Sequence, residues 1–221
     1  ADFDLGGVVG LRLLDAGPRE IAAVTRQLGP IRTSLAREPD DAVCRFGHAR
    51  VLLDRARALA AQGEDGAACL QGAEEELETA LRLGHAGGRV HRARGWVHLE
   101  AATLEHRNGR TARTRFERAI AEFAAAAEAN PDPGHDFLHR ARAHAALAME
   151  ETLARQDSRG SYERALVDLD RAIGILPDDP EPLVERGTVH FSMALVALVQ
   201  GRDPRSSLEK SLRDLESARG I

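Results

Sequence analysis

The sequence predicts an all-α fold built from repeated helix pairs, and three observations support this. Alanine- and leucine-rich stretches without proline alternate with short breaks at glycine, asparagine or proline. Aromatic residues make up only 4% of the chain and charged residues 29%, a composition that suits long helices packed through small side chains. Finally, the same residue types return every 46 residues. Such a repeat buries its apolar face against the next copy of itself, which makes a solenoid.

The period is visible in columns of equivalent positions. Four columns are apolar or small: Leu70, Phe116, Tyr162 and Leu208; Ala73, Ala119, Ala165 and Ser211; Leu77, Phe123, Leu169 and Leu215; and Ala80, Ala126, Ala172 and Ala218. Three lie upstream: Ala49, Gly95, Ala141 and Gly187; Arg94, Arg140 and Arg186; and Gly63, Gly109 and Gly201 with Arg155 in the third place. These columns predict repeats at 45–90, 91–136, 137–182 and 183–221 within a single domain, 1–221.

Each repeat has the pattern of two helices. Residues 91–107 are rich in helix formers and end at Asn108-Gly109, and residues 112–129 end before Pro131, which cannot continue a helix. In the second segment, Phe116, Ala119 and Phe123 recur at helical spacing and share one face. Both segments are therefore predicted to be helices of about 17 residues, roughly 25 Å long.

The period alone suits HEAT or armadillo repeats, which span roughly 40–47 residues. The residue pattern differs from them. The spacing of Phe116, Ala119, Phe123, Ala126 and Pro131 resembles the second helix of the tetratricopeptide-repeat (TPR) family, and pairs such as Arg186-Gly187 resemble its first helix. The usual TPR unit is about 34 residues, so the surplus of about 12 lies between these signatures and lengthens both helices. The resemblance implies a right-handed α-solenoid of antiparallel helix pairs, a TPR-like superhelix.

The resemblance covers residues 45–221 well and residues 1–44 poorly. The first segment fits through Val24, Ile31, Ser34 and Pro39. Gly29-Pro30 falls where the second helix should be continuous, and Gly6-Gly7 weakens the first. We expect residues 1–44 to form a degenerate terminal repeat that caps the solenoid.

Composition excludes several classes of function. A net charge of −5 and a pI near 6.0 argue against a nucleic-acid binder. No apolar run approaches the roughly 18 residues of a membrane helix, and nothing at the start has the pattern of a signal peptide. Cys44 and Cys69 provide no disulfide framework, so we expect a cytoplasmic protein. Arginine almost replaces lysine, of which Lys210 is the sole example, as in bacteria with GC-rich genomes.

No catalytic constellation is found, so the sequence predicts neither an enzyme nor a cofactor or metal site. His98, His144 and His190 recur at the repeat period, but equivalent positions in stacked repeats lie about 8–10 Å apart and cannot share one metal ion. We interpret them as packing residues. Glu74, Glu75 and Glu76 point in different directions on a helix and are interpreted as a solvated face.

The TPR resemblance implies that first helices line a concave groove in which a partner peptide lies. The residues carried over to that groove are Trp96, Arg50, Arg92, Arg142, Leu99, Leu138 and Phe191. Tryptophan and arginine are enriched at binding hot spots, so an acidic or carboxylate-bearing protein segment is the expected partner. The lysines and asparagines of the family's carboxylate clamp are absent, which argues against capture of a peptide C-terminus. Alternatively, Trp96 packs on the neighbouring helix and the arginines are merely solvated.

Two functions are consistent with these features. The first is a protein-interaction scaffold with a preformed groove, which binds without much loss of ordering entropy. The second is a self-assembly module of a larger bacterial protein, because Leu208, Leu212 and Leu215 form an apolar stripe on the last helix that is expected to stack on another copy. An enzyme at the groove would need a polar cluster with perturbed pKa values.

Overall fold

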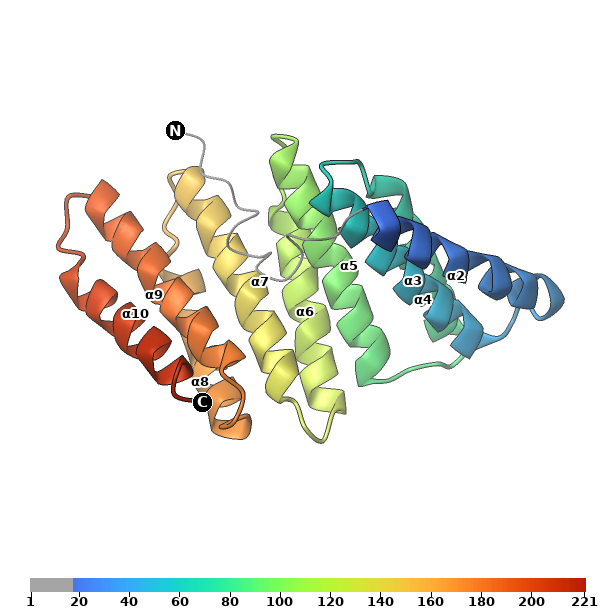
Figure 1. Ribbon diagram of the computed structural model, residues 1–221. Coiled ribbons are helices and arrows are strands. Elements are labelled where there is room, and N and C mark those ends of the chain that lie inside the picture. Colours follow the sequence, from blue (N-terminus) through green and yellow to red (C-terminus); the bar gives the residue numbers. More distant parts are fainter. Residues whose placement is uncertain (1–17) are drawn as a thin grey trace. The chain divides into compact units, whose positions relative to one another are not determined.

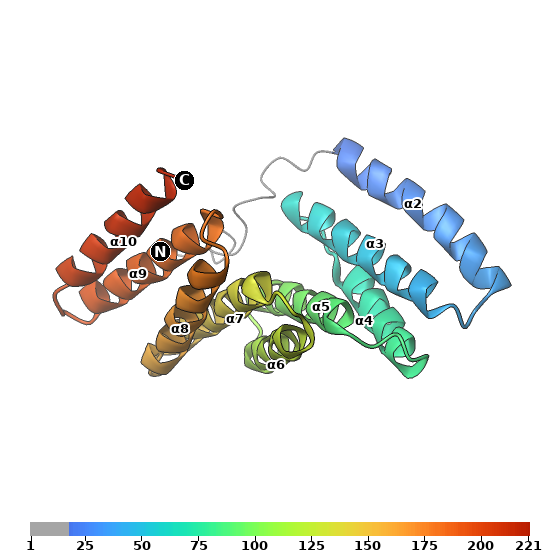
Figure 2. The ribbon, with the colours of Figure 1, turned by 90° about the horizontal axis from the view of Figure 1, so that it is seen from below.

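The computed structural model describes residues 18–221, and over that range the protein is all-helical, with nine helices and no strand (Figure 1). The helices are α2 (Pro18–Arg37), α3 (Ala42–Ala61), α4 (Ala67–Arg82), α5 (Gly88–Arg107), α6 (Arg113–Ala129), α7 (Gly134–Leu153), α8 (Arg159–Ile175), α9 (Glu181–Val199) and α10 (Arg205–Ala218). Helices adjacent in sequence pack on one another, as with α3 on α4 and α9 on α10 (Figure 2). This arrangement confirms the predicted helical-repeat solenoid fold.

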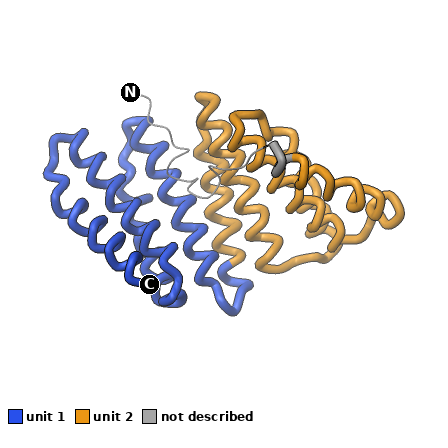
Figure 3. The backbone as a smooth tube through the Cα atoms, in the orientation of Figure 1, with its two compact units in different colours: residues 1–9, 127–221 blue, residues 10–126 orange. Residues whose placement is uncertain are grey.

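The described chain divides into two compact units (Figure 3). Unit 2 contains α2 to α5 and most of α6, and unit 1 contains α7 to α10 after the boundary between residues 126 and 127. A single domain over 1–221 stays a prediction, and each unit is described by itself below.

Helix bounds agree closely with the expected hairpins. The predicted segments 91–107 and 112–129 correspond to α5, Gly88–Arg107, and α6, Arg113–Ala129. The first helices of the four repeats have 19 or 20 residues and the second helices 14 to 17. The surplus length of the repeat therefore lies in longer helices, and the turns between them stay short.

Each first helix ends in the same turn. Gly63, Gly109 and Gly201 have φ of 75°, 69° and 69°, and Arg155, in the equivalent place, has φ of 57°. In each case the next amide donates to the carbonyl five residues earlier, as from Glu64 to Leu59 at 2.9 Å. This bond pattern is the Schellman motif, which needs a left-handed residue and therefore favours glycine. The recurrent glycines therefore mark the C-terminal ends of the first helices.

The small-residue column is explained by a close approach between the two helices of a repeat. A β-carbon at Gly95 in α5 would lie 2.6 Å from the Phe123 ring in α6, and one at Gly187 in α9 would lie 3.1 Å from Leu215 in α10. Phe123 is fully buried. Small residues at this position therefore allow a large side chain from the second helix to fill the space.

The N-terminal repeat differs from expectation at one point. Helix α2 continues through Gly29 and Pro30, although the sequence pattern placed a break there. Leu28 is buried, and Val24 and Ile31 pack against the same core, so tertiary packing outweighs the local cost of an internal proline. The predicted weakness at Gly6-Gly7 lies outside the described residues.

By length and composition alone, α9 is apolar enough to cross a membrane. Glu185 and Arg186 near the start of α9 interrupt its apolar sequence, so no uninterrupted apolar run of that length was found in the sequence. In this structure α9 is a repeat helix: Val189 and His190 are buried, and Arg186 forms an ion pair with Asp214 of α10 at 2.6 Å.

Candidate functional site

A cross-helix contact between a basic side chain and a carboxylate recurs in all four repeats at the same two positions. The pairs, each joining the first helix to the second, are His48–Glu76, Arg94–Glu122, Arg140–Asp168 and Arg186–Asp214, with N–O distances of 3.0, 2.7, 2.6 and 2.6 Å. Asp168 and Asp214 are buried, and their arginines donate two hydrogen bonds each. The sequence columns include the three arginines but not the carboxylates, each of which lies 28 residues after its basic partner. These residues hold the hairpins together, so they are not available as partner contacts.

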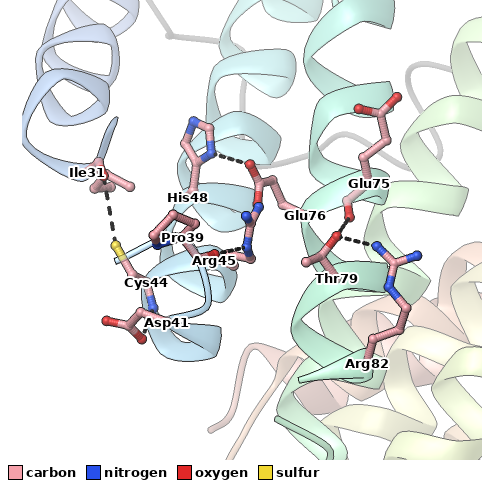
Figure 4. Close-up of polar contacts among 10 residues, drawn as sticks. All are labelled: Ile31, Pro39, Asp41, Cys44, Arg45, His48, Glu75, Glu76, Thr79 and Arg82. Carbon is pink, nitrogen blue, oxygen red and sulfur yellow. Dashed lines mark hydrogen bonds and ion pairs between the residues drawn. The ribbon is translucent and has the colours of Figure 1, made fainter. Parts of the chain in front are cut away.

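The same contacts correct the interpretation of Glu74 to Glu76. Glu76 accepts hydrogen bonds from Arg45 at 2.7 Å and contacts His48, as Figure 4 shows. Glu74 accepts one from Arg115 at 2.8 Å. Glu75 is exposed, and its carboxylate accepts a hydrogen bond from Gln71 of the same helix at 3.0 Å. Two of the three carboxylates are therefore interhelical ties and not part of a solvated face.

The histidine ladder consists of buried residues, as interpreted from the sequence. His98, His144 and His190 are 3%, 6% and 9% exposed. Burial lowers the pKa of His98 and of His144 to about 4 and also lowers that of His190, so all three are neutral at pH 7. Within the described residues no cluster of histidine, cysteine, aspartate or glutamate has the arrangement of a metal site.

Cys44 has no feature of an activated nucleophile. Its thiol lies 3.9 Å from the carbonyl oxygen of Ile31 in α2 (Figure 4). Burial and the nearby Asp41 raise the pKa of the thiol, which lowers the fraction of reactive thiolate.

The structure corrects three of the predicted partner contacts. Leu99 and Leu138 are fully buried, so they are core residues and present no surface to a ligand. Arg142 is also largely buried, because its guanidinium bridges Glu181 and Glu185 of α9 at 2.9 and 2.5 Å. Phe191 is 48% exposed on α9.

The remaining three predicted contacts come together in unit 2. Arg50 of α3 and Arg92 and Trp96 of α5 line one pocket of about 310 Å³ between these two first helices. The complete lining is Phe46, Arg50, Leu53, Asp54, Arg57, Arg89, Arg92, Ala93 and Trp96. Phe46 and Leu53 lie one period of 46 residues before the predicted contacts Arg92 and Leu99. Arg57 and Arg89 were missed, although each lies seven residues from a predicted contact and so on the same helical face.

The pocket has an apolar base and a cationic rim. Leu53 and Ala93 are buried, whereas Arg50, Asp54 and Arg89 are exposed. The Arg57 guanidinium lies 4.4 Å from the centre of the Trp96 ring, and its Nε donates to Glu100 at 2.7 Å. The other side of the tryptophan meets the edge of Phe123 at 5.7 Å. Trp96 is thus held in place by packing and still forms one wall of the pocket.

A second exposed feature lies in unit 1. Leu208, Leu212 and Leu215 of α10 are 40%, 59% and 39% exposed at helical spacing. The equivalent residues Tyr162 and Leu169 in α8 are buried in a core that includes Val189, Met193 and Val196 of α9. In the preceding repeat, α9 covers the equivalent face of α8. The leucine stripe is therefore the corresponding face of α10 in an exposed state.

Comparison with known proteins adds no family assignment. No family model matches the chain, and no curated protein matches it.

Proposed function

We propose that this protein is a non-catalytic interaction scaffold of the TPR type that binds an acidic segment of a partner protein between α3 and α5. The observation that carries the proposal is the pocket itself: a chain with net charge −5 gathers four arginines around two aromatic side chains on adjacent first helices. Arginine and tryptophan in a partly desolvated pocket are the usual components of a binding hot spot. We further propose that the protein is bacterial and cytoplasmic.

Preorganisation supports this role. Arg57 is fixed by Glu100 and by stacking on Trp96, so its side-chain entropy is already lost before a ligand arrives. Both helices are anchored in the unit 2 core, to which Phe46 and Trp96 contribute. An acidic segment that lies along α3 and α5 would meet aligned guanidinium groups and apolar surface together.

A pull-down from native lysate tests the proposal. The test variant carries Arg50→Glu and Arg89→Glu, which reverse two exposed charges at the pocket without removing a core residue. The matched control carries Arg118→Glu, an exposed arginine of α6 in the same unit that does not line the pocket. We expect a partner retained by the parent and the control and lost by the test variant. Retention by all three would rule out this pocket as the binding surface.

A second candidate function, self-assembly through α10, is supported by the exposed leucine stripe. A second copy that buries Leu208, Leu212 and Leu215 would replace the cover that α9 gives the equivalent face of α8. Sedimentation at increasing protein concentration should then show a dimer that Leu212→Glu abolishes. A parent that stays monomeric at high micromolar concentration would exclude this function.

A further inference from the structure

The pocket between α3 and α5 holds more positive charge than one carboxylate would balance. Of its four arginines, Arg57 is neutralised by Glu100. Asp54 is the single carboxylate of the lining. In the part of the chain that the structure describes, Arg50 and Arg89 form no ion pair.

These two arginines line the same pocket from the two helices that form it, Arg50 from α3 and Arg89 from α5. Leu53 and Ala93, which also line the pocket, are buried and give it some apolar surface. Arg50 also lies 6.0 Å from the Phe46 ring, whose face favours a cation.

We infer that the pocket recognises a phosphorylated serine or threonine side chain of the partner; this rests on the proposed function and names the group that anchors it. A phosphoryl group carries about −1.5 to −2 charges at pH 7 and three strong acceptor oxygens, which matches two guanidinium groups. A carboxylate carries one charge and would leave one arginine without a counter-charge. The volume of about 310 Å³ is at the small end of ligand pockets and has room for a phosphorylated side chain.

Peptide selection on the immobilised 221-residue chain tests the inference. Three degenerate peptide libraries are compared, with phosphoserine, glutamate or serine fixed at the centre. We expect the phosphoserine library to be retained at least about tenfold better than the glutamate library, in a salt-sensitive manner. Because Trp96 is the only tryptophan in the sequence and lines the pocket, its fluorescence should change as an enriched peptide is titrated.

Variants locate the binding. Arg50→Gln and Arg89→Gln should each weaken the enriched phosphopeptide by about tenfold or more, whereas Arg118→Gln should not. Both pocket arginines are exposed, and circular dichroism checks that the variants keep their helices. Inorganic phosphate is the competitor, and an affinity equal to that of the peptide would assign the pocket to a small anion and overturn the inference.

The remaining outcomes separate the two proposals. Equal retention of the glutamate and phosphoserine libraries would overturn the phosphate inference and leave the acidic-peptide scaffold in place. If no library is retained, the inference is wrong. The pull-down with the Arg50→Glu, Arg89→Glu variant then decides the scaffold separately, because it does not depend on the chemistry of the anchor.

Discussion

At the scale of single residues, the space around a glycine decides what its replacement does. Gly95 and Gly47 both lie inside first helices of unit 2. A β-carbon on Gly95 would lie 2.6 Å from Phe123, whereas one on Gly47 would meet nothing within 4 Å. The two positions therefore separate packing from helix propensity.

We expect Gly95→Ala and Gly47→Ala to change stability in opposite directions. Overpacking against the buried Phe123 ring should destabilise the first variant by about 1–2 kcal/mol, even after the gain in helix propensity. The second should be stabilised by about 0.5–1 kcal/mol, because alanine restricts the unfolded chain and favours the helix. Urea denaturation of both variants measures the difference. Stabilisation by Gly95→Ala would show that the two helices are not in close approach.

At the scale of the helix and its turn, one of the four first helices ends in a left-handed residue that is not glycine. Three of the four first helices end in a left-handed glycine, and the third repeat uses Arg155 with φ of 57°. Left-handed backbone costs a non-glycine residue about 1–2 kcal/mol. The bond from Gln156 to the Glu151 carbonyl at 2.7 Å shows that the Schellman turn nevertheless forms.

Replacing Arg155 by glycine should therefore stabilise the protein. We expect a gain of about 0.5–1 kcal/mol, which is the relief of backbone strain less the larger entropy of glycine in the unfolded state. Gly109→Ala, at the equivalent turn of the preceding repeat, is the reverse control and should cost about 1 kcal/mol. Thermal denaturation reports both effects. A loss of stability in Arg155→Gly would mean that the arginine side chain contributes more than the strain removes.

At the scale of the whole molecule, the histidine ladder predicts sensitivity to acid. His98 lies in unit 2, and His144 and His190 lie in unit 1. Burial lowers the pKa of His98 and of His144 to about 4, below the ordinary value of 6.5. The unfolded state therefore binds more protons than the folded state between these values. The free energy of unfolding is highest above pH 6.5 and falls as the pH drops toward 4.

The variant His144→Leu should lose part of this dependence. Between pH 6.5 and 4, His144 is expected to contribute a fall of about 1–3 kcal/mol in the free energy of unfolding, and leucine cannot be protonated. The charged groups around His144 are Asp168, Arg164 and Arg140, and all remain in the variant. His135→Asn, an exposed position on the same helix, is the control. Urea titrations at several pH values test this, and equal slopes for parent and His144→Leu would contradict it.

Most of the fold was predictable because its information is local and periodic. The 46-residue columns located the helices, their glycine ends and the small residues between them, and the structure confirms each. Helix-breaking residues act over one or two positions, so the ends of α5 and α6 could be predicted to within about a turn. The exception is α2, in which packing of Leu28 carries the helix across Pro30.

The sequence by itself determined the fold class, the repeat and the face on which Arg50, Arg92 and Trp96 lie. Only the tertiary structure decided which groove positions remain open. Leu99 and Leu138 were predicted to face the groove but are fully buried, and Arg142 is held by two glutamates of α9. Register is a property of one helix, whereas burial and charge pairing depend on side chains contributed by neighbouring helices, 28 or more residues away in these ion pairs. For the same reason the surplus of positive charge between α3 and α5 became visible only when both helices were placed together.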